Sequence, residues 1–116
     1  MPPEQGYVYI LANGYKRLYT GVTSSLAQRI REHKGQIHPE SFTARFNIDR
    51  LVYYECYESI SRAIAREKEI KGMLRVKKIQ LIVGLNPDWK DLSLEWGREI
   101  DPFDEAKMAP PRTFGS

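Results

Sequence analysis

Residues 6–22 read GYVYILANGYKRLYTGV, and this stretch decides the fold. Residues 6–11 and 17–22 are rich in aromatic and β-branched side chains, which favour β-strands. Asn13 and Gly14 lie between the two segments, and an Asn-Gly pair favours a tight turn with positive φ at the glycine. We therefore predict a β-hairpin whose turn takes positive φ at Gly14.

Helix and strand signals follow the hairpin. Residues 26–34 carry apolar side chains at helical spacing, after a run of Thr and Ser that can cap a helix and before a glycine that can end it. Residues 36–49 show no clear period, and we expect a long functional loop that borders the site. Residues 51–57 read LVYYECY and predict a third strand.

Two further helices are predicted after this strand. Ser59 can cap a helix that runs to about residue 75, and its apolar stripe is Ile60, Ala63, Ile64, Ile70 and Leu74. Residues 76–85 predict a second helix, which Asn86 and the following proline stop. We expect its inward side chains to be Val76, Ile79, Ile82 and Val83, and those that pack back from the next segment to be Trp89, Leu92, Leu94 and Trp96.

The order ββαβαα predicts an α/β (α+β) fold with a small three-stranded, mostly antiparallel sheet flanked by helices. We expect one domain over residues 6–96, a flexible N-terminus over residues 1–5 and a mobile tail over residues 97–116. The formal charge of +3 is compatible with a polyanionic partner but does not decide for one. The lone Cys56 excludes an intrachain disulfide, and we expect it to be buried. We find no leader or membrane-span signal, and expect a cytoplasmic protein.

Glu67 does not fit a purely structural interpretation of its helix. A helical wheel places it in the middle of the apolar stripe. A carboxylate at such a position needs a partner, so Glu67 either forms a structural ion pair or serves as a ligand in a cleft. Lys71 lies near the same face, but its long stem can carry the ammonium to solvent.

Two pairs of polar side chains are further candidates, one on the first predicted helix and one in the hairpin. Arg29 and His33 are four residues apart, so they share one helix face, either as a solvated flank or as part of a site. Tyr9 and Tyr19 lie inside their strands, where core packing is the ordinary role of a tyrosine. Because we find no carboxylate cluster or paired histidines, any metal should be a hard, water-rich ion such as Mg²⁺.

The order and spacing of these residues resemble the GIY-YIG nuclease superfamily. The two family motifs fall on residues 7–9 (Tyr-Val-Tyr) and 19–21 (Tyr-Thr-Gly), with ten positions from Tyr9 to Tyr19. The other active-site positions of the family fall on Arg29, His33 and Glu67. The chain is similar to small stand-alone bacterial members and to the GIY-YIG nuclease domain of excinuclease ABC, over roughly residues 6 to 92.

The chain departs from the family pattern at two positions. Tyr7 stands where many members have the glycine that opens the first motif. Val22 stands where the excinuclease domain has a lysine, which removes a possible phosphate contact. No separate DNA-targeting segment is recognised, so we expect low sequence specificity or a protein partner that supplies it.

The resemblance implies a metal-dependent endonuclease that hydrolyses nucleic-acid phosphodiester bonds, most of all DNA, in repair or recombination. Glu67 would hold Mg²⁺ or Mn²⁺, and Tyr19, with Tyr9 beside it, would orient or deprotonate the attacking water. Arg29 would bind the scissile phosphate, and His33 would be a second phosphate contact or a proton carrier. The candidate nucleic-acid contacts are Arg29, His38, Arg45, Lys71, Lys77 and Lys78.

Gly21 and Asn86 are further candidates for lining the site, although Asn86 before a proline is also an ordinary helix end. One alternative function is a nucleic-acid-binding module that keeps the fold without catalysis. Another is a protein-interaction domain, in which Trp89 and Trp96 would form a docking surface. Cleavage that depends on a divalent metal would distinguish the nuclease from both.

Overall fold

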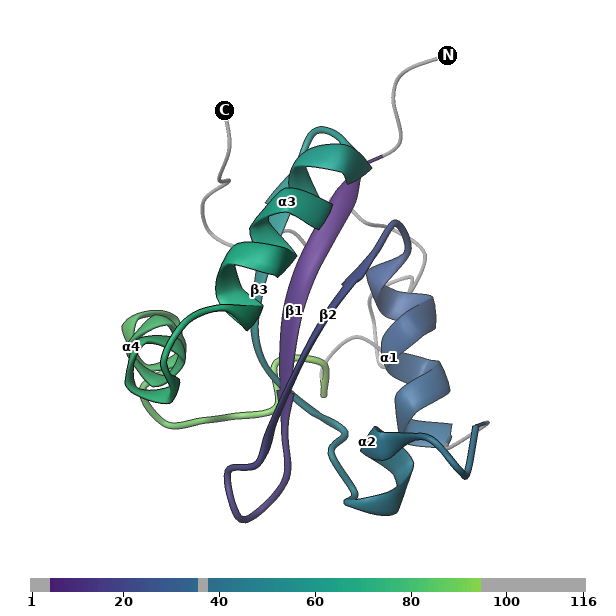
Figure 1. Ribbon diagram of the computed structural model, residues 1–116. Coiled ribbons are helices and arrows are strands. Elements are labelled where there is room, and N and C mark those ends of the chain that lie inside the picture. Colours follow the sequence, from purple (N-terminus) through teal and green to yellow (C-terminus); the bar gives the residue numbers. More distant parts are fainter. Residues whose placement is uncertain (1–4, 36–37, 95–116) are drawn as a thin grey trace.

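The computed structural model describes residues 5–35 and 38–94, and its centre is a three-stranded antiparallel sheet (Figure 1). The central strand is β1 (Gly6–Ala12), with β2 (Leu18–Thr23) on one side and β3 (Arg50–Tyr57) on the other. The predicted fold class is therefore confirmed. The residues assigned to a mobile tail, 97–116, and residues 1–4 lie outside the described ranges.

Four helices complete the described part of the chain. They are α1 (Leu26–Gly35), α2 (Phe42–Arg45), α3 (Ile60–Lys71) and α4 (Arg75–Leu85). The predicted order ββαβαα holds apart from the short α2, which lies inside the segment that we expected to be a loop. None of the described helices is long and apolar enough to span a membrane.

The β1–β2 turn differs from the prediction. The carbonyl of Asn13 accepts from the backbone N–H of Lys16 at 3.0 Å, and its side-chain oxygen accepts from the N–H groups of Tyr15 and Arg17. Lys16 takes the positive φ of 62°, and Gly14 lies outside that region, so the prediction for Gly14 was wrong. The Asn13 side chain closes a longer loop than the two-residue turn that Asn-Gly favours.

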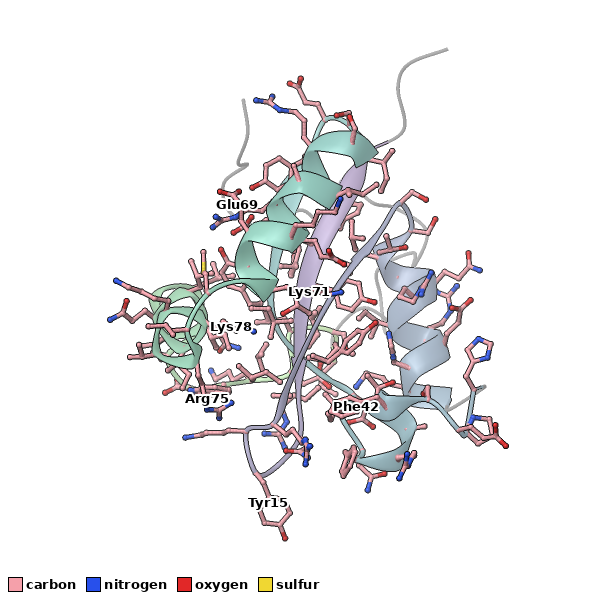
Figure 2. The ribbon with its side chains drawn as sticks, viewed as in Figure 1. Tyr15, Phe42, Glu69, Lys71, Arg75 and Lys78 are labelled. Carbon is pink, nitrogen blue, oxygen red and sulfur yellow. The ribbon has the colours of Figure 1, made fainter. Side chains whose placement is uncertain are left out.

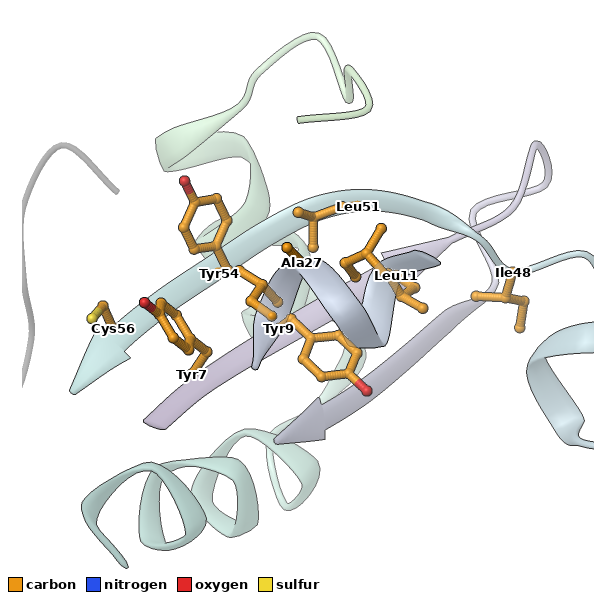
Figure 3. Close-up of a cluster of buried hydrophobic side chains, with 10 residues drawn as sticks. Tyr7, Tyr9, Leu11, Ala27, Ile48, Leu51, Tyr54 and Cys56 are labelled. Carbon is orange, nitrogen blue, oxygen red and sulfur yellow. The ribbon is translucent and has the colours of Figure 1, made fainter. Parts of the chain in front are cut away.

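Both faces of the sheet are covered by helices, so β1 is buried along its whole length. Tyr7, Tyr9 and Leu11 point to one face and pack with α1 residues, as Figure 3 shows. Val8 and Ile10 point to the other face, where α3 and α4 contribute Ala63, Ile70 and Ile82. Cys56 is buried on the α1 face, as predicted.

Helix α3 begins after Ser59 as predicted, and the Ser59 hydroxyl accepts from the backbone N–H of Arg62. The helix ends at Lys71, because the chain turns there and Leu74 becomes the N-cap of α4, 73% exposed. Ile64 is 39% exposed, so the prediction that Ile64 and Leu74 belong to a buried stripe was wrong. The helix lies so close to β1 that a Cβ on Gly6 would come within 2.6 Å of Ala63 Cβ.

The last described elements bury fewer side chains than predicted. In α4 Ile82 is buried, whereas Val76 and Val83 are exposed, because α4 touches the sheet with one narrow side. Trp89 and Leu92 are partly buried and pack against the two clusters, as expected, but Leu94 is exposed. Trp96 lies outside the described residues.

Candidate active site

Tyr9, Tyr19 and His33 form the centre of the candidate site. The hydroxyl of Tyr9 lies 3.2 Å from Nε2 of His33, and the ring centroids of the three residues are 5.7 to 6.3 Å apart. His33 lies on α1, and both tyrosines point to the face of the sheet that α1 covers. Burial, followed by the neighbouring Tyr19, raises the pKa of Tyr9, so this phenol is neutral at physiological pH.

His33 has a protein partner at each ring nitrogen. Nδ1 lies 3.0 Å from Oγ1 of Thr43 in α2, and Nε2 meets Tyr9. Burial, followed by the positive charge of Arg29, lowers the pKa of His33, which keeps the imidazole neutral at pH 7. One of the two bonds is therefore donated by the ring and the other is accepted by it.

Gly21 makes room for the Tyr9 ring. The two residues are paired across β1 and β2, and a Cβ on Gly21 would come within 2.4 Å of both Cζ and Oη of Tyr9. No real Cβ sits that close to a ring, so a side chain there would displace the tyrosine. Glycine is required at this position because the Tyr9 ring lies across the backbone of β2.

A cavity of about 350 Å³ opens beside this cluster. Arg29 lines it with a half-exposed guanidinium, whose Nε lies 3.5 Å from a carboxylate oxygen of Glu32. The predicted loop contributes to the wall through α2 and the residues before it. The full lining is Tyr19, Arg29, Glu32, His33, His38, Ser41, Phe42, Thr43 and Ala44.

Glu67 approaches the cluster from α3, although it is not among the residues that line this cavity. Its side chain is 14% exposed and its Oε2 lies 3.0 Å from Nζ of Lys71, which is 52% exposed. The Glu67 charge contributes to raising the pKa of Tyr9, so it acts electrostatically on the cluster. Figure 2 shows Lys71 projecting from α3 over β2. The structural pair therefore exists, but its cation is in contact with solvent.

A buried ion pair that sequence reasoning missed holds α3 against β3. Glu55 is fully buried, and Nε and Nη2 of Arg66 donate to its two oxygens at 2.9 and 3.1 Å. The hydroxyls of Tyr53 and Tyr57 donate to the same carboxylate. Glu67 follows Arg66 in the chain, so this anchor fixes the rotation of the part of α3 that carries Glu67. A glutamate inside the apolar run 51–57 was the signal for it.

The remaining predicted contacts are spread over the molecule. His38 lines the cavity, whereas Arg45 lies outside the lining with its guanidinium 5.8 Å from the Phe46 ring. Lys77 and Lys78 belong to α4, which packs on the opposite face of the sheet from α1. Asn86 ends α4, and its side-chain NH₂ donates to the carbonyls of Val52 and Lys90. These two bonds give Asn86 a structural role.

Glu67 alone, as a single carboxylate, could serve only a hard ion that needs few protein ligands. Within residues 5–35 and 38–94 no group of three or more His, Cys, Asp and Glu side chains could hold a metal. Mg²⁺ accepts one or two carboxylates and completes its shell with water and substrate phosphate. The partly exposed Glu67 carboxylate fits that mode of binding, provided that Lys71 moves aside.

Comparison with known proteins shows the family of the chain. The sequence model of the GIY-YIG catalytic domain matches residues 5–80, which include Tyr9, Tyr19, Arg29, His33 and Glu67. The chain belongs to the GIY-YIG catalytic domain family. The resemblance seen in the two tyrosine motifs is therefore confirmed, and the chain falls among nuclease-type domains.

Small proteins of this GIY-YIG type are among its relatives. A UPF0213 protein of Syntrophus aciditrophicus is 38% identical over 79 residues, which cover 68% of this chain and 91% of that protein. A UPF0213 protein of Haloquadratum walsbyi is 40% identical over 75 residues, which cover 65% and 83%. The solution NMR structure of a UPF0213 protein from Bacillus halodurans superposes with a TM-score of 0.50 and 28% identity, over 78% of this chain and 95% of that one.

Proposed function

We propose that this GIY-YIG protein is a divalent-metal-dependent endonuclease that hydrolyses phosphodiester bonds of nucleic acid, with DNA as the first substrate to test. The observation that carries the proposal is the cavity in which Tyr19, Arg29 and His33 meet. These residues come from β2 and α1, and the family pattern predicts that they act together. The half-exposed Arg29 guanidinium and the neutral His33 therefore lie where a ligand in the cavity can reach them.

Arg29 is the cation that binds the scissile phosphate in this proposal. Its guanidinium is half exposed, and its pair with Glu32 is a long contact at 3.5 Å. Such surface pairs contribute about 0 to 1 kcal/mol, so an incoming phosphate can replace Glu32. A guanidinium binds phosphate through two parallel hydrogen bonds and stabilises the charge that develops as the bond breaks.

The cluster of Tyr9, Tyr19 and His33 orients the attacking water. Tyr19 lines the cavity, so its hydroxyl is the one that water and substrate can reach. Tyr9 is almost completely buried and bonded to His33, so it positions the histidine and Tyr19. Because both nitrogens of His33 have protein partners, we assign it to orientation or proton transfer within the cluster, and not to direct phosphate binding.

Glu67 is the residue that would hold Mg²⁺ or Mn²⁺. Such an ion supplies positive charge that stabilises the leaving 3′ oxygen. The Glu55 and Arg66 anchor orients the helix from which Glu67 projects. Lys71, which pairs with Glu67 in the free protein, becomes available to the backbone of the bound strand once the carboxylate takes another partner.

A second candidate function is nucleic-acid binding without cleavage. Val22, at the position where the excinuclease domain has a lysine, favours it, as does the Lys71 ammonium beside the Glu67 carboxylate. Arg29 and the basic side chains around the hairpin would then serve for backbone contacts only.

Incubation of the purified protein with supercoiled plasmid and with structured oligonucleotides tests the proposal. We expect nicking that requires Mg²⁺ or Mn²⁺ and stops when a chelator removes the metal. Salt-dependent binding with no cleavage at any metal concentration would contradict the nuclease proposal and select the binding module.

A further inference from the structure

Phe42 is an apolar ring in the wall of a cavity that also presents charged and polar side chains. It is 44% exposed, while the same cavity presents Arg29, Glu32 and two histidines. Figure 2 places Phe42 on the side of α2 that faces the β1–β2 hairpin. Leu74 and Val76 are more exposed, but Phe42 lies in a cavity wall beside charged side chains, so its ring offers an apolar face that a ligand in this cavity can cover.

The Phe42 ring has an aromatic and a cationic neighbour. Its centroid lies 5.0 Å from that of Phe46, and the Arg17 guanidinium lies 5.2 Å from the Phe42 ring and 4.0 Å from the Phe46 ring. The Ser41 hydroxyl caps α2 by accepting from the N–H of Ala44. The Asn13 side chain donates to the carbonyl of Phe46 at 2.9 Å, which ties α2 to the hairpin. The ring is therefore preorganised for a partner.

The surroundings define the chemistry of that partner. Arg29 lines the cavity, Arg17 lies beside both phenyl rings and Arg45 beside Phe46, and these cations favour an anionic ligand. The Phe42 ring favours a planar face, and the bases of a polynucleotide combine such faces with an anionic backbone. A base inside an intact duplex has both faces covered by its neighbours, so only an unpaired and unstacked base is free to meet Phe42.

We propose that Phe42 is a stacking platform for one unpaired base next to the scissile phosphate, in DNA or RNA. The proposal rests on the nucleic-acid substrate of the proposed function and adds the state of the base beside the cut. Tyr15 is more exposed than Phe42, but it lies at the tip of the hairpin outside the cavity lining, so it serves as the matched control.

Binding measured without cleavage tests the proposal. The full-length protein in chelator is titrated with a single-stranded DNA oligonucleotide, its RNA counterpart and the blunt DNA duplex, each containing 2-aminopurine. We expect Phe42→Leu, which keeps an apolar side chain but removes the aromatic face, to weaken binding of single strands about 5- to 100-fold. We expect Phe42→Trp and Tyr15→Ala to bind as tightly as the wild type, and 2-aminopurine emission to be quenched only when an aromatic residue occupies position 42.

Several results would overturn this inference. One is single-strand binding by Phe42→Leu that equals the wild type, with melting curves that show both proteins folded. Another is an equal loss of affinity for duplex and single strands. If the wild type binds no oligonucleotide, the stacking role fails together with the nuclease proposal. If Phe42 governs binding but no metal supports cleavage, only the nuclease proposal fails. A wild type that cleaves while Phe42→Leu binds normally contradicts the stacking role alone.

Discussion

The hydroxyl of Tyr9 lies 3.2 Å from Nε2 of His33 and so links the central strand to α1 at the middle of the candidate site. Thr43 meets the other ring nitrogen, which extends the link to α2. This chain of side chains joins three separate elements, β1, α1 and α2.

The first prediction concerns the pH dependence of stability. The pKa of His33 is lowered on folding from its ordinary value of 6.5, so the unfolded chain binds a proton more readily than the native state. The contribution of neutral His33 is fully present above pH 6.5 and is lost as the pH falls through the lower native pKa. We expect His33→Gln to flatten the decrease in unfolding free energy between pH 7 and pH 5, as measured by urea denaturation. His38→Gln, at an exposed histidine, is the control and should keep most of the wild-type slope, because His38 is a smaller cause of the lowered His33 pKa than burial and Arg29. An unchanged slope in His33→Gln would contradict the assignment.

Gly21 gives a second prediction. Gly21→Ala places a Cβ within 2.4 Å of the Tyr9 hydroxyl, so the ring must shift away from His33. Overpacking of this kind costs about 1 to 3 kcal/mol, and cleavage should fall as well. Gly14→Ala is the matched control, because its Cβ meets no atom within 4 Å. Thermal melts in which both variants resemble the wild type would mean that the Tyr9 ring does not lie across β2.

The third prediction concerns the ion pair of Glu55 and Arg66, which anchors α3. Arg66→Met leaves the fully buried Glu55 carboxylate without its cation, which typically costs roughly 3 to 5 kcal/mol. The double variant Glu55→Gln with Arg66→Met should recover part of that loss, since it removes the stranded charge. Urea denaturation of the single and double variants measures the difference. Equal stability of the two would show that Glu55 does not depend on Arg66.

The fourth prediction concerns Arg29. Because its side chain is half exposed and weakly paired, Arg29→Ala should change the free energy of unfolding by less than about 1 kcal/mol. Its loss should lower kcat for cleavage about 100- to 1000-fold, as removal of a preorganised charge-stabilising group does. Arg29→Lys should restore only part of the rate, since an ammonium cannot bind phosphate through a planar pair of bonds. Arg62→Ala removes an exposed charge from α3 and should cleave normally. Wild-type kcat in Arg29→Ala would contradict the role.

The sequence predicted the hairpin, α1 and β3 well, because alternating or helical apolar patterns and Ser or Gly signals mark them. It failed at the turn, where the Asn13 side chain rather than a glycine sets the backbone. It also misplaced the end of α3, because a helix pattern does not show where tertiary contacts turn the chain. Leu74 fits the apolar stripe, yet it caps the next helix.

The sequence likewise predicted some residues of the candidate site and missed others. Motif spacing brought Tyr9, Tyr19, Arg29 and His33 together, since strand register and one helix fix their positions. Motif spacing could not predict the side chains that contact the site through long-range packing. Thr43 reaches His33 only because α2 folds back on α1, and the pair of Glu55 with Arg66 requires knowing which side of α3 meets β3.

The central claim is that Glu67 holds the metal of a nuclease, and Glu67→Gln tests it. Glutamine keeps the volume and helix preference of glutamate but cannot supply the charge of a ligand. Lys71 is half exposed, so the substitution strands no buried cation and should change stability by no more than about 1 kcal/mol. A large drop in the melting temperature without metal would instead support a structural ion pair. Glu69→Gln, an exposed glutamate of the same helix, is the control.

The most direct measurement is the rate of plasmid cleavage by Glu67→Gln and Glu69→Gln over a series of Mg²⁺ and Mn²⁺ concentrations. We predict that Glu69→Gln cleaves as the wild type does. Glu67→Gln should remain folded and give no cleavage above the level seen in chelator at any metal concentration. Metal-dependent cleavage by Glu67→Gln at the wild-type rate would contradict the account.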